Sequence, residues 1–255
     1  MQLVSVCCSL ARLNIPNLSI ISRSAEVICE MLPEHRDEVF GHGQDVAIAI
    51  YSFAKLRALT NPSLWPTLLS LFHHTVDGMV AAHLTMCVTA FKRVRVQLTP
   101  SLVAALNRRA MKVMAEFSAT GLALFLRDVE VVSESLLSRV VMHLPRLLES
   151  ASAEDVAVLV REGLLSVTTA RPPPLAVLDV LRPFIIQFAG SFTDVQRLGI
   201  VESLLHHHGE EESVVEVLDT FRMVGYVDPT SRGLSVSEKI ITIEDGPAVA
   251  QPLLA

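Results

Sequence analysis

Apolar side chains recur along most of the chain at the spacing of an amphipathic helix. Positions three, four and seven residues apart lie on one side of an α-helix. In one such segment the apolar residues on a single face are Val46, Ile50, Phe53 and Leu56. The same spacing recurs in the segments 64–72, 80–91 and 102–113. The alternation of apolar and polar residues that is typical of a strand is missing, so the pattern predicts an all-α fold.

The helical segments also repeat. The residues from Ser52 to Leu56 match in character those from Ala90 to Val94, which lie 38 positions later. An upstream copy begins at Ser9, 43 positions before Ser52. Weaker copies follow at 124–129, 164–167 and 204–205. We therefore expect an α-solenoid of about six helical-hairpin repeats with a period of about 38 residues.

The junction inside each hairpin has a recognisable chemistry. Asn61-Pro62-Ser63-Leu64 returns as Thr99-Pro100-Ser101-Leu102 at the same offset of 38. The Asn61 or Thr99 side chain is expected to cap the second helix, and Pro62 or Pro100 to occupy its first turn, where a missing N–H costs nothing.

The repeat pattern divides the chain in two. We assign residues 1–226 to the helical-repeat solenoid and residues 227–255 to an irregular tail that becomes ordered against a partner. Within this tail, residues 239–243 have the pattern of a short strand.

The composition is 51% hydrophobic, with a mean hydropathy of +0.45, yet no stretch reaches the roughly 18 apolar residues of a membrane span. Such apolar helices suit interior repeats, or a subunit buried in a larger complex.

Charge is distributed unevenly between the two halves. Residues 1–127 contain 12 Lys/Arg and 8 Asp/Glu, a net charge of +4, whereas residues 128–255 contain 9 and 19, a net charge of −10. This asymmetry predicts two surfaces with different partners. The acidic C-terminal half would suit a basic protein partner.

The N-terminal segment favours a mitochondrial location. Before Glu26, the first acidic residue, the chain contains Arg12, Arg23 and five serines, which is the composition of a mitochondrial presequence. The alternative is that the segment from Leu3 to Leu13 is simply the first repeat helix. The four cysteines lack metal-binding spacing, which fits a mitochondrial or another reducing intracellular compartment.

The segment from Ala49 to Leu56, AIYSFAKL, followed by a proline-led second helix, resembles the octotricopeptide-type repeats of organellar RNA proteins and the similar array of FAST-kinase-like mitochondrial proteins. The resemblance covers about residues 1–226 and is strongest over 45–114. It implies a role in RNA processing, RNA stability, translation or mitoribosome assembly. Residues 244–247 echo part of a RAP domain, but too few residues follow for a whole one, so the nuclease-like activity of that domain is not implied.

Basic residues form the candidate binding site. Arg12, Lys55 and Arg93 each precede the same apolar position of successive repeats, so they are expected to align along one face. The further candidates for contact with RNA or another partner are Lys92, Arg95, Arg108, Arg109 and Lys112. Rows of Lys and Arg are typical of surfaces that bind phosphate backbones. The alternative is an ordinary solvated face, or one that binds acidic protein, since the net charge is −6 and aromatic residues are few.

No residue pattern indicates catalysis. The run His206-His207-His208 lacks the spacing of a metal site, because adjacent residues on a helix point about 100° apart. His73 and His74 are expected at a helix end. We therefore expect no catalytic centre, no bound metal and no cofactor.

Two hypotheses for function remain. In one, the chain is a non-catalytic subunit of a mitochondrial RNA-containing complex and binds single-stranded or ribosomal RNA, other subunits of that complex, or both. In the other, it is a protein-only, HEAT-like scaffold in a different multisubunit assembly.

Overall fold

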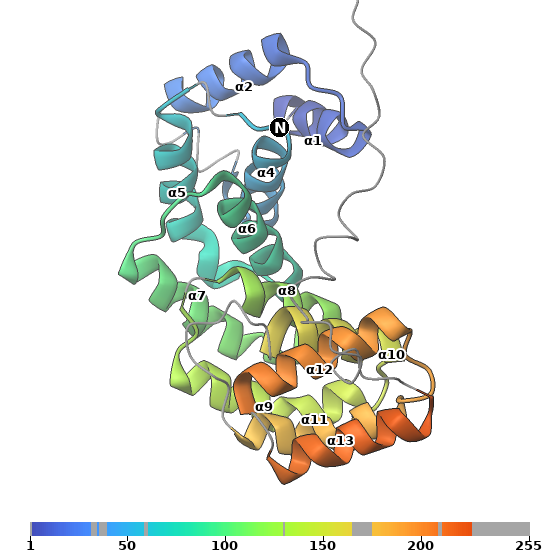
Figure 1. Cartoon of the computed structure of the whole chain (residues 1–255). Coiled ribbons are helices and arrows are strands. Elements are labelled where there is room, and N and C mark those ends of the chain that lie inside the picture. Colours follow the sequence, from blue (N-terminus) through green and yellow to red (C-terminus); the bar gives the residue numbers. More distant parts are fainter. Residues whose placement is uncertain are drawn as a thin grey trace, which may run out of the picture.

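The computed structural model describes residues 2–31, 35, 40–58, 61–129, 131–164, 175–208 and 211–225 (Figure 1). Every regular element within these segments is helical, which confirms the predicted all-α fold. The tail assigned to residues 227–255 lies outside the described residues, as does the strand considered at 239–243. None of the described helices is both long and apolar enough to cross a bilayer.

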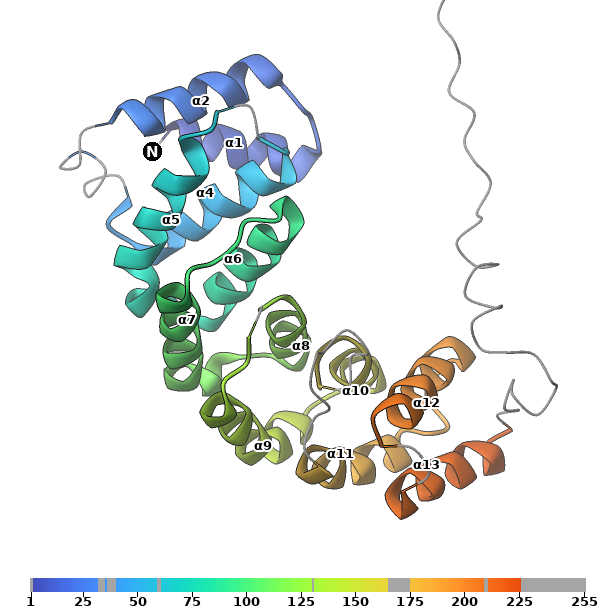
Figure 2. The ribbon, with the colours of Figure 1, turned by 60° about the vertical axis from the view of Figure 1, so that its left-hand side comes forward.

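The helices alternate between two rows that follow an arc (Figure 2). The inner row consists of α1 (Gln2–Leu13), α4 (Gly43–Lys55), α6 (Ala81–Val94), α8 (Ala119–Asp128), α10 (Ala153–Val158) with the π-helical turn η3 (Leu159–Leu164), and α12 (Asp194–His208). The outer row consists of α2 (Leu18–Glu30), α5 (Leu64–Thr75), α7 (Pro100–Lys112), α9 (Glu134–Leu148), α11 (Leu175–Gln187) and α13 (Glu212–Met223). Each inner helix and the outer helix after it make one hairpin. Short 3-10 turns, η1 (Val76–Gly78) and η2 (Met114–Glu116), follow α5 and α7.

Helices of the same row pack on one another. Along the inner row α1 contacts α4, α4 contacts α6, α6 contacts α8, and α8 contacts η3. In the outer row α2 contacts α5, and the series α7, α9, α11 and α13 is joined in order. Inner-row helices that are separated in sequence by a whole outer helix therefore lie side by side.

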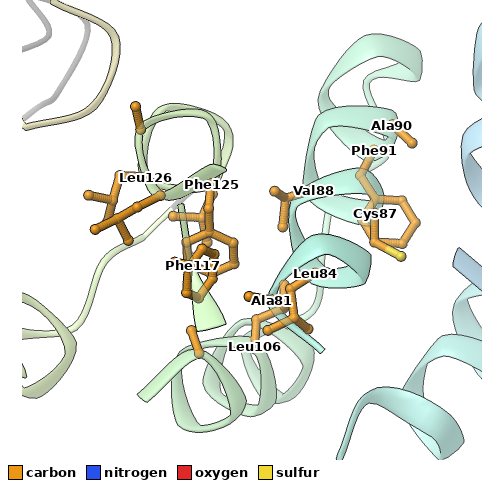
Figure 3. Close-up of a cluster of buried hydrophobic side chains, with 14 of the residues drawn as sticks. Ala81, Leu84, Cys87, Val88, Ala90, Phe91, Leu106, Phe117, Phe125 and Leu126 are labelled. Carbon is orange, nitrogen blue, oxygen red and sulfur yellow. The ribbon is translucent and has the colours of Figure 1, made fainter. Parts of the chain in front are cut away.

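The core lies between the rows and between successive hairpins. In Figure 3, Leu84 and Val88 of α6 point toward Phe117 and Phe125, while Phe91 projects from the opposite side of α6. The Phe91 ring meets that of Phe72 on α5 edge to face, with centroids 5.3 Å apart. Helix α6 therefore buries apolar side chains on two sides, one facing α5 and the other facing the next hairpin.

The predicted capping holds at one junction and is wrong at the other. Thr99 accepts a hydrogen bond from the N–H of Leu102, and Pro100 is the first residue of α7. In the preceding hairpin the helix begins only at Leu64, and the Asn61 side chain instead accepts from the N–H of Ser63 at 2.9 Å. Asn61 thus closes a local turn, because an Asx side chain satisfies the backbone N–H two residues on as readily as a helix end.

Candidate nucleic-acid interface

The first three inner helices end in the same backbone motif. The N–H of Ile15 donates to the carbonyl of Leu10 at 3.0 Å, that of Ala58 to Phe53 at 2.9 Å, and that of Val96 to Phe91 at 3.0 Å. The residue before each of these donors bonds to the carbonyl three positions earlier. This pair of hydrogen bonds defines the Schellman motif, which satisfies carbonyls that the end of a helix leaves free. The motif recurs at the same offsets along the chain as the repeated sequence blocks.

The Schellman motif requires one residue in the left-handed backbone region. That residue is Asn14 with φ 55° after α1, Arg57 with φ 53° after α4, and Arg95 with φ 57° after α6. Among the described residues no other non-glycine residue has positive φ. The fourth inner helix ends differently, because Val129 after α8 has φ −74°.

Basic side chains occupy the last turn of each of these three helices. Arg12, Lys55 and Arg93 each lie two residues after Leu10, Phe53 or Phe91, whose carbonyl accepts the Schellman hydrogen bond that spans five residues. In Figure 2 the C-terminal ends of α1, α4 and α6 lie on the same side of the inner row. Positive charge at a helix C-terminus is favoured by the helix dipole. We call these three residues, together with Arg57 and Arg95, the basic edge.

The five side chains of the basic edge have no acidic partner within the described part of the chain. Arg12, Arg57, Arg93 and Arg95 are exposed, and Lys55 is half-buried. Their guanidinium and ammonium groups are therefore available to a ligand. Arg57 was not among the residues singled out from the sequence, although it lies 38 positions before Arg95, and this offset is the signal that would have found it.

Lys92, in contrast, is held by the next hairpin. Its Nζ lies 3.3 Å from Oδ1 of Asp128 and donates to the carbonyl of Arg127 at 2.9 Å. Thr89 donates to Oδ2 of the same carboxylate at 2.7 Å, and Arg127 donates to both of its oxygens at 2.7 and 2.9 Å. The Asp128 side chain is only 2% exposed. This network joins α6 to α8, so Lys92 serves the packing of hairpins in addition to any role in binding.

The regular series of unpaired basic residues ends at α8, where the equivalent arginine is paired with acidic residues. Arg127 occupies in α8 the place that Arg93 has in α6, two residues after a buried Phe. Its Nη1 donates to Oε2 of Glu162 at 3.0 Å, and Glu162 lies 35 positions further on in η3. Arg127 is thus neutralised from both sides, and the edge beyond it carries an acidic residue.

Burial and the network act on Asp128 in opposite directions. Burial raises the pKa of its carboxyl, but hydrogen bonds from Arg127 and Thr89 and the charges of Arg127 and Lys92 lower it, and the net pKa lies below the ordinary value. The hydrogen bonds to Asp128 likewise raise the pKa of Arg127, although partial burial opposes the rise. Both groups are therefore charged across the physiological range.

The three basic residues predicted on α7 lie on the outer row, away from the basic edge. Arg108 Nη2 lies 3.9 Å from Oδ2 of Asp77, and Arg109 Nε donates to the carbonyl of Met79 at 2.7 Å. Lys112 is exposed at the end of the helix. The structure therefore separates the predicted site residues into an inner set and an outer set.

A small cavity lies near the start of α4. It has a volume of about 410 Å³, and its lining includes His42, His74 and His83. Burial lowers the pKa of His83, although Asp45 and Glu116 act to raise it. No group of three or more His, Cys, Asp or Glu residues with metal-binding geometry occurs in the described segments. The cavity offers imidazole and backbone groups to a small ligand.

His73 and His74 lie at a helix end, as the sequence predicted. They are in the last turn of α5, with ring centroids 5.9 Å apart. The run that begins at His206 ends α12 at His208.

The described part of the C-terminal half presents acidic side chains. Three of its six described basic residues form ion pairs: Arg182 with Glu216, Arg197 with Asp194 and Arg222 with Asp219. Exposed carboxylates without an ion pair among the described residues are Glu149, Asp179, Glu211 and Glu212. The charge asymmetry of the sequence thus corresponds to two differently charged ends of the arc.

No protein-family model matches this chain, and a search of the curated proteins finds no match. The resemblance to octotricopeptide-type and FAST-kinase-like repeats therefore stays a prediction.

Proposed function

We propose that the chain is an α-solenoid of six helical-hairpin repeats that serves as a non-catalytic subunit of an organellar, mitochondrial RNA-containing complex. The repeat proposal is supported by the alternation of inner and outer helices and by inner helices that begin at residues 2, 43, 81, 119, 153 and 194. The intervals between these starts are close to the sequence period. A hairpin that buries apolar side chains on two sides needs neighbours to cover them, as in repeat proteins.

The basic edge is the surface that contacts RNA in this proposal. The single observation that carries it is the recurrence of one helix-end motif in three successive hairpins, each with basic residues that have no acidic partner in the described part of the chain. A regular row of positive charge suits a phosphate backbone, whose negative charges are also regularly spaced. The acid-free, serine-containing start of the chain supports the mitochondrial location.

A direct test measures binding of the full chain to a fluorescein-labelled single-stranded RNA of 20 nucleotides by anisotropy, from 50 to 300 mM KCl. We expect binding that weakens steeply with salt, because each phosphate contact releases condensed counterions. A double variant, Arg12→Ala with Arg93→Ala, should weaken binding and flatten the salt dependence. Absence of binding by the wild-type chain at 50 mM KCl would exclude direct RNA contact.

A protein-only scaffold, similar to HEAT-repeat subunits, is the second candidate. It is favoured by the ion pairs that engage Lys92 and Arg127 inside the array and by exposed apolar side chains such as Leu13, Leu18, Met142 and Met223, which are 68 to 80% exposed. The acidic C-terminal end would then meet a basic protein. Partners that stay bound after nuclease treatment, and that include no RNA-binding protein, would favour this scaffold.

A further inference from the structure

Arg57 and Arg95 hold a backbone conformation that disfavours arginine. In the left-handed region the Cβ atom of an L-residue crowds the following carbonyl oxygen, so glycine or asparagine is the usual choice there. The first hairpin follows this rule with Asn14, but the next two hairpins place arginine at the equivalent position, with φ 53° and 57°. The motif itself uses only backbone atoms, so it does not need an arginine side chain.

No intramolecular contact within the described part of the chain accounts for these two arginines. Both side chains are exposed, and neither has a hydrogen-bond or ion-pair partner among the described residues. Non-glycine residues that the surrounding structure holds in a sparsely populated backbone region cluster at binding and catalytic sites. We infer that Arg57 and Arg95 are phosphate-binding residues of the basic edge, kept at these positions at the expense of stability. This inference rests on the proposed RNA-binding function.

The chemistry favours a phosphate chain over an acidic protein. Four of the five residues of the basic edge are arginines, whose planar guanidinium matches two phosphate oxygens at once. Neighbouring packed helices lie about 8–10 Å apart, so α1, α4 and α6 present cations at regular intervals over about 20 Å. The phosphates of a nucleic-acid backbone are regularly spaced, whereas the carboxylates on a protein surface are not.

The test compares stability and RNA binding in one double variant, Arg57→Gly with Arg95→Gly. Relief of the left-handed conformation should raise Tm by about 2–4 °C per position. Each phosphate contact to a single strand contributes about −0.7 to the slope of log K against log salt. With the five residues of the basic edge in contact the slope should be about −3.5, and with three of them it should be about −2.1. At about 0.1 M salt this corresponds to binding about 25-fold weaker. A variant that is more stable and binds more weakly is the expected result.

Two controls separate strain from charge. Asn14→Gly changes the residue at the same left-handed position of the first hairpin without loss of charge, so RNA binding should not change. Arg139→Ala with Arg146→Ala removes two exposed positive charges from α9 in the outer row, and should leave the salt slope within error of wild type.

Three results would overturn the inference. Wild-type affinity in the double glycine variant would show that these arginines do not contact the RNA, while the proposed function would stand through the other basic residues. A double variant no more stable than wild type would remove the premise of a conformational cost. Competition by polyglutamate as strong as that by unlabelled RNA would identify an acidic protein as the ligand. Failure of wild-type RNA binding, in contrast, would reject the proposed function itself.

Discussion

The carboxylate of Asp128 lies at the contact between the third and fourth hairpins and is almost closed off from solvent. It accepts hydrogen bonds from Thr89 and Arg127 and forms an ion pair with Lys92, so residues of both α6 and α8 meet on it. When one member of a buried ion pair is removed, the charged groups that remain lose their partner. This loss costs more free energy than the intact pair contributes.

We expect Asp128→Asn to lower the free energy of unfolding by about 2–3 kcal/mol. The amide keeps the size of the side chain but no longer compensates Arg127 and Lys92. Urea denaturation at pH 7 measures the change. Asp219→Asn is the matched control, because Asp219 forms an exposed pair with Arg222 and should cost at most about 0.5 kcal/mol. Equal effects of the two substitutions would contradict a structural role for the network.

The lowered pKa of Asp128 should also make the stability of the chain depend on pH under acidic conditions. Because the folded-state pKa of Asp128 lies below its ordinary value, its stabilisation is fully present above the unfolded-state pKa of about 3.9 and is lost as pH falls through the folded value. The difference in unfolding free energy between wild type and Asp128→Asn should therefore be constant from pH 7 to about pH 5 and shrink below about pH 4. Denaturation at a series of pH values tests this, and a difference independent of pH would refute it.

At the scale of elements, the close approach of α8 and η3 in the inner row depends on a glycine. A Cβ placed on Gly163 in η3 would lie 2.8 Å from the Cα and 3.3 Å from the Cβ of Ala123 in α8. Backbone atoms cannot move aside as a flexible side chain can, so any larger residue would push the two helices apart.

Gly163→Ala should therefore destabilise the chain by about 1–3 kcal/mol, the usual cost of overpacking. Gly190→Ala is the control, because nothing lies within 4 Å of its Cβ position and its φ is not positive; it should change stability by no more than about 0.5 kcal/mol. Thermal unfolding followed by circular dichroism compares the two. A neutral Gly163→Ala would mean that η3 and α8 separate without cost.

At the scale of the whole molecule, the proposed repeat architecture makes a prediction about cooperativity. In such arrays each hairpin contacts only its neighbours, so terminal hairpins lack one interface. Native-state hydrogen exchange followed by mass spectrometry should show the strongest protection in α4, α6 and α8 and the weakest in α1, α2 and α13. Uniform protection along the chain would indicate a single cooperative domain instead of a solenoid.

Part of the candidate site was predictable, and part was not. The offset of 38 placed Arg93 in register with Lys55, because equivalent residues of a repeat occupy equivalent positions. Arg57 was missed, although it lies 38 positions before the predicted Arg95 and so occupies the equivalent place after its helix. The engagement of Lys92 by Asp128 was not predicted, because Asp128 belongs to the next hairpin and its side chain reaches α6 only through the packing of α8.

The sequence by itself determined that this chain is helical, that α7 begins at Pro100 after the Thr99 cap, and that the two halves of the chain differ in charge. These properties follow from local spacing, helix caps and composition, which act within a few turns of the chain. Tertiary structure alone decided which basic residues are neutralised, which have no acidic partner among the described residues and where glycine permits close packing. Those outcomes depend on distances between residues that belong to different hairpins, and only the stacking of hairpins sets such distances.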